Sequence, residues 1–215
     1  MKLRLPLSCF SLMAVSMMLT GCVTKPYNYT NFRAHPPRSI LVLPPLNEST
    51  AVEGTYSYLS TATYPLAEMG YYVFPVAVVD HFLKENGMPT AGEMHQIPLV
   101  RVRDIIGADA VLYITLKQYG TKYVVISSVT TVALHGKLVD TQTGLVLWEG
   151  DGLGQDNSGG SGNPIADLIA AAVTQVVNSS VDHGHTVCRV ANANLFSLKD
   201  HGLLCGPYIP KKLEQ

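Results

Sequence analysis

The hydrophobic pattern of this chain changes its period part-way along, and that change restricts the folds that the chain can adopt. Continuous apolar runs occupy residues 39–43 and 110–116, and such runs are typical of parallel strands that are buried on both faces. From residue 122 to 139 apolar and polar residues alternate instead, and after a turn at 140–144 a partner strand returns over 145–149. Alternation predicts a hairpin of antiparallel strands. The sequence therefore predicts an α/β fold with a mixed sheet.

Helices are expected between and after these strands. Apolar residues at helical spacing mark four segments, which are 55–69, 76–86, 98–106 and 163–177. Pro65 is expected to break the first helix or to start a new one, because proline removes a helix hydrogen bond. A further strand is expected at 71–75. The order of elements predicts a single α/β domain over residues 39–215, with about five strands covered by three to four helices.

The glycine-rich stretch at residues 150–163 is expected to form a flexible loop. It contains no lysine, which a phosphate-binding P-loop requires at its end. The Gly-x-Ser-x-Gly elbow of serine hydrolases does not occur in the sequence. The last 35 or so residues show no clear period and are expected to be irregular.

The N-terminal segment has the form of a secretory signal. Lys2 and Arg4 precede an apolar run that ends in Leu19-Thr20-Gly21-Cys22, and a charged start, an apolar segment and small residues before a cleavage site are typical of exported proteins. The last four residues resemble a bacterial lipobox. That likeness implies cleavage after residue 21 and attachment of a diacylglycerol to the thiol of Cys22. An ordinary signal peptide and a transmembrane anchor are the alternatives.

Removal of the predicted signal peptide, residues 1–21, leaves 194 residues with 13 basic and 16 acidic side chains, enough for one domain. No stretch gathers lysine and arginine, so the basic footprint of a nucleic-acid-binding protein is missing. No apolar run long enough for a second membrane span follows Cys22. Residues 22–38 have no apolar period and include the pair Pro36-Pro37, which predicts an extended tether between the lipidated N-terminus and the domain.

Two cysteines, Cys188 and Cys205, remain in the domain after Cys22 is acylated. In an oxidising compartment such a pair is expected to form a disulfide, and two separate buried cysteines are the alternative. His183, His185 and His201 lie close by in the sequence. Thiolate and imidazole together suit zinc, so a metal site in this tail is a second alternative, although the spacing matches no known zinc module. The expectation is no metal and no cofactor.

The remaining polar groups point to surface and interface positions. The acidic pairs Asp80/Glu85 and Asp104/Asp109 stand at ordinary helix ends and are interpreted as solvated or capping groups. The chain contains 11 tyrosines, whose apolar ring and polar tip suit interfaces. A cluster of them at an interface is one interpretation, and strand and core positions are the other.

Four motifs spread along the chain, ILVLPP, PLAEMGYYVFPV, GADAVLYITLKQYG and GLLCGPY, resemble a family of Gram-negative lipoproteins of unknown function. Members of that family tend to accompany CsgG-type secretion lipoproteins. The resemblance implies a fold similar to the N-terminal domain of TolB and to LpoB, and it brings no catalytic residues. Val23 follows Cys22, so the aspartate that typically retains such lipoproteins in the inner membrane is absent. By that analogy the protein reaches the outer membrane, on its periplasmic face.

The function expected from these features is that of a non-enzymatic accessory or assembly component, lipid-anchored in the outer membrane, that binds periplasmic or outer-membrane proteins. No nucleic-acid partner is expected, and association with copies of itself is open. Two alternatives remain: a metal-binding or hydrolytic lipoprotein that uses the His/Cys tail, and an LpoB-like regulator of peptidoglycan synthesis.

Overall fold

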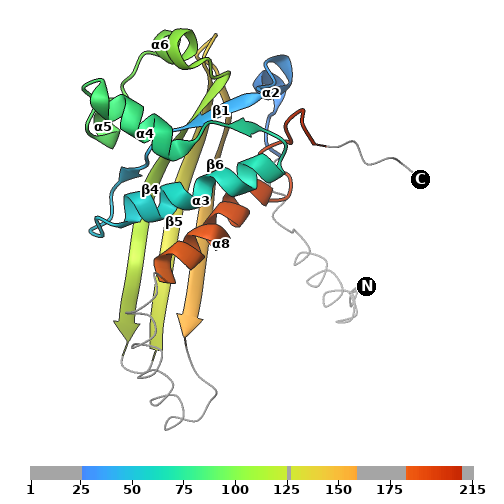
Figure 1. Ribbon diagram of the computed structural model, residues 1–215. Helices are drawn as coiled ribbons and strands as arrows, with labels where there is room; N and C mark the ends of the chain where they lie inside the picture. The colour runs from blue at the N-terminus through green and yellow to red at the C-terminus, as the bar shows by residue number, and fades with distance from the viewer. Residues whose placement is uncertain (1–25, 125–126, 159–182, 210–215) are drawn as a thin grey trace, which may run out of the picture.

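A mixed sheet of six strands forms the centre of the described part of the chain, which comprises residues 26–124, 127–158 and 183–209 of a computed structural model (Figure 1). Five strands follow the order β3-β1-β4-β5-β6, and β2 also pairs with β4. β1 is parallel to β3 and β4, whereas β4, β5 and β6 are antiparallel. The strands are β1 (Ser39–Val42), β2 (Leu46–Asn47), β3 (Tyr72–Val73), β4 (Ala110–Val124), β5 (Ser127–Asp140) and β6 (Val146–Ser158). The predicted mixed α/β fold is confirmed.

Strand β1 shows why its sequence is apolar without alternation. Ile40 and Val42 belong to one core cluster, and Leu41 and Leu43 belong to a second cluster. Each of these side chains is at most 1% exposed. Since successive side chains of a strand point to opposite faces, the sheet at β1 is covered on both sides.

Helices form the two covering layers. One layer consists of α3 (Gly54–Glu68) and α8 (His183–Ser197), which lie side by side in Figure 1 and contribute to the larger core cluster. The opposite layer consists of α4 (Val76–Glu85), α5 (Ala91–Met94), α6 (Leu99–Arg101) and the π-helical turn η2 (Val102–Ile106). The helices predicted at 76–86 and 98–106 are therefore present.

The three strands β4, β5 and β6 form a long antiparallel unit, which we call the blade. They contain 15, 14 and 13 residues, and in Figure 1 they extend past the helices in one direction. We call the end at Ala110, Asp140 and Val146 the base, and the end at Ser158 the tip. At about 3.4 Å per residue, β6 places the tip about 40 Å from the base.

The strand boundaries in the blade correct the prediction. The run at 110–116 was expected to end before a separate strand at 122–139, but β4 continues to Val124, which pairs with Ser127 of β5. The register of β4 against β5 shifts between Leu116 and Gln118. Such a bulge changes which residues face the core, and that break in alternation resembles the end of a strand in the sequence.

The glycine-rich stretch from residue 150 to 158 is part of β6, not a flexible loop. Helix α8 packs directly on it. A Cβ added at Gly152 would lie 2.5 Å from the Ala191 carbonyl oxygen, and one at Gly154 would lie 2.4 Å from the Val187 carbonyl oxygen. The glycines are needed there because only a strand without side chains lets the helix backbone approach so closely.

Helix α8 occupies part of the tail that was expected to be irregular. Its buried side chains recur at helical spacing and are Val187, Cys188, Ala191, Asn192, Leu195 and Phe196. This stripe is present in the sequence, but it includes a cysteine, an asparagine and an alanine and so has a weak hydrophobic signal.

Helix α3 also differs from expectation, because it runs through Pro65 without a break. Proline inside a helix costs about 3 kcal/mol. Tyr58, Ala62 and Leu66 are all fully buried against the sheet on the same helix, and burial of large apolar side chains contributes roughly 1.5–3 kcal/mol each. The packed face therefore outweighs the cost of the proline.

A short helix, α5, was not predicted, although the sequence contains its signal. Thr90 and Glu93 form a capping box, in which the Glu93 N–H donates to the Thr90 hydroxyl and the Glu93 carboxylate accepts from the Thr90 N–H.

The predicted signal peptide, Cys22 and the helix expected at 163–177 lie outside the described residues.

His95, at the end of α5, is expected to make stability depend on pH. Burial lowers the pKa of its imidazole, whose Nε2 lies 2.9 Å from the Pro44 carbonyl oxygen. The unfolded chain therefore binds a proton more readily than the folded chain, so stability falls as the pH drops below about 6.5 towards the folded-state pKa. The measurement is urea unfolding at pH 7 and at pH 5. Between these two pH values the free energy of unfolding should fall less for His95→Gln than for the parent protein. An equal loss in both proteins would contradict this role.

Candidate functional site

The outer edge of β6 is an edge of the described sheet. β6 pairs with β5 on one side and forms the edge of the described sheet on the other. In an antiparallel strand alternate residues direct both their N–H and C=O groups towards the same side. The Glu149 N–H donates to the Tyr27 hydroxyl at 3.1 Å and not to β5, so Glu149, Asp151, Leu153 and Gln155 are the residues whose backbone groups point outwards.

Two side chains already occupy part of this outward row. The Tyr27 hydroxyl accepts from the Glu149 N–H, and the Asn194 side-chain amide of α8 donates to the Leu153 carbonyl oxygen at 2.6 Å. Between these two contacts lies Asp151, and beyond them lies Gln155. Edge strands with unpaired backbone groups are templates for an added strand, and here the positions open to such pairing are defined by the register.

A cavity of about 370 Å³ lies beside this edge near the base. Its lining comes from β5 and β6, from α8 and the segment after it, and from the N-terminal segment, and includes Tyr27, His135, Gly150, Leu198 and His201. The cavity therefore reaches around the edge of the sheet, and it brings together segments that are far apart in the sequence.

The N-terminal segment is docked on the domain from Tyr27 onwards, which shortens the tether predicted for residues 22–38. The Tyr27 N–H donates to the Asp200 carbonyl oxygen at 3.0 Å, and the Tyr29 hydroxyl donates to the Gly202 carbonyl oxygen. Helix α2 (Thr30–Ala34) follows, and its Phe32 is only 4% exposed. The sequence shows no apolar period here because a single buried phenylalanine and two hydrogen-bonded tyrosines make these contacts.

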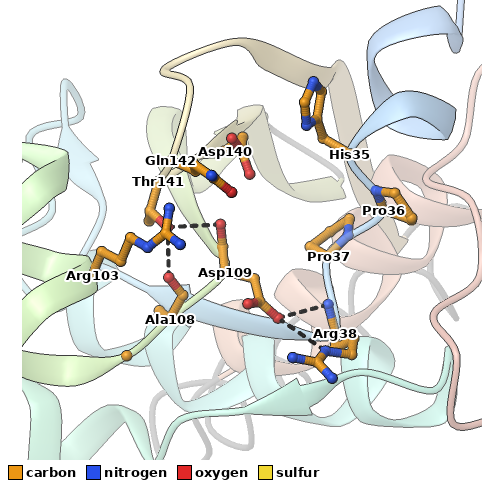
Figure 2. Close-up of a pocket in the computed structure, with 11 residues that line it drawn as sticks. His35, Pro36, Pro37, Arg38, Arg103, Ala108, Asp109, Asp140, Thr141 and Gln142 are labelled. Carbon is orange, nitrogen blue, oxygen red and sulfur yellow. Dashed lines mark hydrogen bonds and ion pairs between the residues drawn. The ribbon is translucent and has the colours of Figure 1, made fainter.

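A polar pocket of about 390 Å³ lies at the base, between the segment after α2 and the loops around β4 and β5 (Figure 2). Asp109 stands at its centre and accepts hydrogen bonds from the backbone N–H groups of Arg38 and Ser39 at 3.0 Å each. The Thr141 hydroxyl contacts the carbonyl oxygens of Ala108 and Asp109 at 2.7 and 2.9 Å. Figure 2 shows Arg103 directed towards the same space.

The carboxylates of this pocket have structural tasks. Asp109 joins the start of β1 to the start of β4, and Asp140 caps the following turn by accepting from the Thr143 N–H at 2.7 Å and the Thr143 hydroxyl at 2.6 Å. In both residues the accepting oxygen is Oδ2, and its partners are backbone N–H groups and, at Asp140, also the Thr143 hydroxyl. Asp109, predicted to be a solvated or capping group at a helix end, lies beyond the end of η2 and joins the starts of two strands instead.

A second depression, of about 610 Å³, runs between α3 and α8. Its lining is mostly apolar and includes Tyr64, Pro65, Val190 and Asn192. The Thr61 hydroxyl donates to the Tyr58 carbonyl and accepts from the Asn192 amide nitrogen at 2.9 Å. This contact fixes the orientation of the Asn192 amide and holds the two helices in register.

The blade face opposite α8 carries a charged row. The Asp151 carboxylate lies 3.0 Å from His135 Nδ1 and 3.4 Å from Lys117 Nζ. Burial raises the pKa of Asp151, but the hydrogen bond and charge of His135 and the charge of Lys117 outweigh it, so the pKa lies below its usual value. Because the Asp151 side chain is 72% exposed, this row is a solvated surface network.

The disulfide predicted between Cys188 and Cys205 is not formed. Cys188 is buried in α8 and lies near Tyr58 of α3, whose pKa is raised by burial and, less strongly, by its interaction with Cys188. Cys205 is exposed, and its neighbour Gly206 donates to the Met69 carbonyl oxygen at 2.8 Å. Tyr58 and Met69 are about 16 Å apart along α3, whereas a disulfide needs Cα atoms about 4–7 Å apart. Helix α8 and its packing along α3 therefore separate the two thiols.

The alternative zinc site also finds no support in the described part of the chain, where no group of three or more His, Cys, Asp or Glu side chains could hold a metal ion. His185 lies in α8, whereas His201 lies beyond the end of that helix. Of His183 only the backbone, at the start of α8, is described.

The tyrosines divide between the core and separate surface positions. Tyr58, Tyr71 and Tyr119 are buried, whereas four others are more than half exposed on different elements, namely Tyr56, Tyr64, Tyr72 and Tyr208. The two tyrosines whose rings pack on each other, Tyr27 and Tyr29, have centroids 4.9 Å apart and lie in the segment predicted to be a tether.

Among the described residues, no helix is long and apolar enough to cross a bilayer.

The sequence model of the family described as "Putative lipoprotein GNA1162-like" matches residues 27–208. The chain belongs to this family. The GNA1162-like relative "Putative lipoprotein NMB1124/NMB1162" of Neisseria meningitidis serogroup B is 42% identical over 200 residues, which cover 91% of this chain and 93% of the relative. The lipoprotein family indicated by the four sequence motifs is thus confirmed, and membership supports membrane association through a lipid anchor.

One solved structure agrees with the fold of this GNA1162-like chain. The crystal structure of lipoprotein GNA1162 from Neisseria meningitidis matches with a TM-score of 0.55 and 45% identity, over 66% of this chain and 99% of that chain. The C-terminal domain of LpoB from Salmonella enterica is a more distant neighbour, with a TM-score of 0.38 and 20% identity over 65% of this chain and 90% of that domain.

Proposed function

We propose that this GNA1162-like protein is a non-enzymatic lipoprotein of the outer membrane, anchored by acylation of Cys22, and that its blade binds other proteins of the cell envelope. Val23 after Cys22 supports the outer membrane as its location, by analogy with lipoproteins that lack the retaining aspartate. The family membership supports the lipid anchor.

The single observation that carries the binding role is the outward register of β6. Its backbone groups at Asp151 and Gln155 point away from β5 at the edge of a 13-residue strand. Addition of a strand to such an edge supplies main-chain hydrogen bonds, and side-chain contacts on either face of the sheet then give specificity. On one face those contacts would involve the row of His135, Asp151 and Lys117.

A proline at position 151 tests this role. The Asp151 N–H points outwards, so Asp151→Pro removes one donor for an added strand and leaves the ladder with β5 complete. Loss of one such hydrogen bond, about 1.4 kcal/mol, is expected to weaken binding about tenfold. The measurement is crosslinking in intact cells from a photoreactive residue at Gln155, followed by quantification of the crosslinked partner.

Two control variants separate binding from folding. Asp151→Asn removes the carboxylate but keeps the N–H, and it should retain crosslinking. Gly150→Pro removes an N–H that points towards β5 and should destabilise the sheet. Equal crosslinking by Asp151→Pro and Asp151→Asn would contradict strand addition. The identity of the crosslinked protein then decides among a CsgG-type secretion component, a peptidoglycan synthase as expected for an LpoB-like regulator, and a second copy of the chain.

A further inference from the structure

We infer that one end of the domain, next to the N-terminal segment, rests on the phospholipid headgroups and directs the tip of the blade away from the membrane. The contact region, which we call the anchor surface, comprises Tyr27, Tyr29, Arg33, Leu198 and Lys199. This inference rests on the proposed lipid anchor at Cys22.

The chain between the lipid and the domain is short. Only five peptide units separate Cys22 from Tyr27, and they span at most about 18 Å when fully extended. Tyr27 is fixed to the domain at two points, through its N–H to the Asp200 carbonyl oxygen at 3.0 Å and through its hydroxyl, which accepts from Glu149. An acylated Cys22 therefore holds the surface around Tyr27 within that distance of the headgroups.

The side chains of the anchor surface suit a membrane interface. The rings of Tyr27 and Tyr29 pack on each other at 4.9 Å and are only partly buried. Leu198, which lines the same cavity as Tyr27, is 54% exposed, and the neighbouring Lys199 and the α2 residue Arg33 are exposed. Tyrosines, an exposed leucine and basic side chains are the residue types that favour the boundary between headgroups and acyl chains.

The blade extends away from the anchor surface. Tyr27 contacts β6 at Glu149, close to the base, and β6 then continues for nine residues to Ser158. That distance is about 30 Å. With the anchor surface on the membrane, the outward backbone groups of Asp151 and Gln155 lie progressively further from the lipid, where a periplasmic protein can reach them. The competing arrangement is a blade that lies flat along the bilayer.

Quenching by spin-labelled headgroups distinguishes the two arrangements. The acylated full-length protein, with Cys205→Ser, carries a fluorophore at Lys199→Cys or at Gln155→Cys and is reconstituted into vesicles of phosphatidylethanolamine and phosphatidylglycerol that contain headgroup-spin-labelled lipid. The two positions differ by about 20 Å along β6. Quenching at 199 is expected to be at least about threefold stronger than at 155, because such quenching falls steeply with distance. Equal quenching, or stronger quenching at 155, would overturn the inference.

Two further variants make the result specific. Insertion of ten Gly/Ser residues after Thr24 keeps the lipid but lengthens the connection, and quenching at 199 should then fall to the level at 155. Unchanged quenching would show that the tether does not set the orientation. Cys22→Ala should abolish flotation with the vesicles altogether. Continued flotation of Cys22→Ala would refute the proposed lipid anchor itself, a result distinct from an anchored protein with the wrong orientation.

Discussion

Replacement of Gly152 by valine is expected to lower the free energy of unfolding by about 3 kcal/mol, the upper part of the range for overpacked cores. The Cβ alone would lie 2.5 Å from the Ala191 carbonyl oxygen and 2.6 Å from the Leu195 Cβ. Because the first of these atoms is helix backbone, no side-chain rotation relieves the clash, and α8 must move away from β6. The measurement is urea unfolding, followed by circular dichroism, of the mature chain that carries Cys22→Ala.

Leu153→Ala is the matched control for this substitution. Leu153 is the next residue of β6, points to the opposite face and is 49% exposed, so its truncation should change stability by about 0.5 kcal/mol or less. Gly92→Ala is a second control, because nothing but the Thr90 hydroxyl lies within 4 Å of the added Cβ. If Gly152→Val were as stable as these controls, α8 would not pack on β6 as described.

Trp148→Ala is the second substitution with a large expected effect, a loss of about 4 kcal/mol. Trp148 is the only tryptophan of the chain and is fully buried. Its ring packs against Phe196 of α8 with centroids 5.9 Å apart, and its Nε1–H donates to the His201 carbonyl oxygen at 2.8 Å. The substitution therefore leaves a cavity and also releases the segment after α8.

Trp148→Phe separates the two contributions. Phenylalanine keeps most of the buried ring but leaves the His201 carbonyl oxygen without its donor, which is expected to cost about 1–2 kcal/mol. Both variants are measured by urea unfolding followed by far-ultraviolet circular dichroism, since the intrinsic fluorophore is lost. A Trp148→Ala variant within 1 kcal/mol of the parent would contradict the packing of β6 against α8.

Local signals in the sequence were sufficient to predict the central part of the fold. The apolar run at β1 predicts a strand that is covered on both faces. In the structure, the side chains on the two faces of β1 belong to two different core clusters. The apolar stripe of α4 predicts that helix, and the glycine after η2, Gly107, predicts where the second helical segment ends. Gly107 adopts the left-handed conformation, with φ 81°, that commonly ends a helix. In each case the residues that decide the structure are neighbours in the sequence.

The parts that could not be predicted depend on contacts between distant segments. Glycine at 152 and 154 disfavours a strand by itself, and it becomes favourable only because α8, more than thirty residues later, packs on it. The docking of Tyr27 depends on Asp200 in the same way. The lipobox at Cys22 is a local motif and could be recognised, but the outward row at Asp151 follows only from the position of β6 at the edge of the sheet.

The contact between Tyr27 and Glu149 means that the segment that leads to the lipid also covers part of the β6 edge. A single proteolytic cut would therefore remove both the anchor and this cover. A cut between Tyr29 and Phe32 would separate the domain from any lipid on Cys22 and would also take away the hydroxyl that covers the edge of β6. The released fragment would then carry a longer unpaired strand edge, which favours edge-to-edge aggregation. Loss of the N-terminal segment is therefore expected to yield a self-associating fragment, not a monomeric domain.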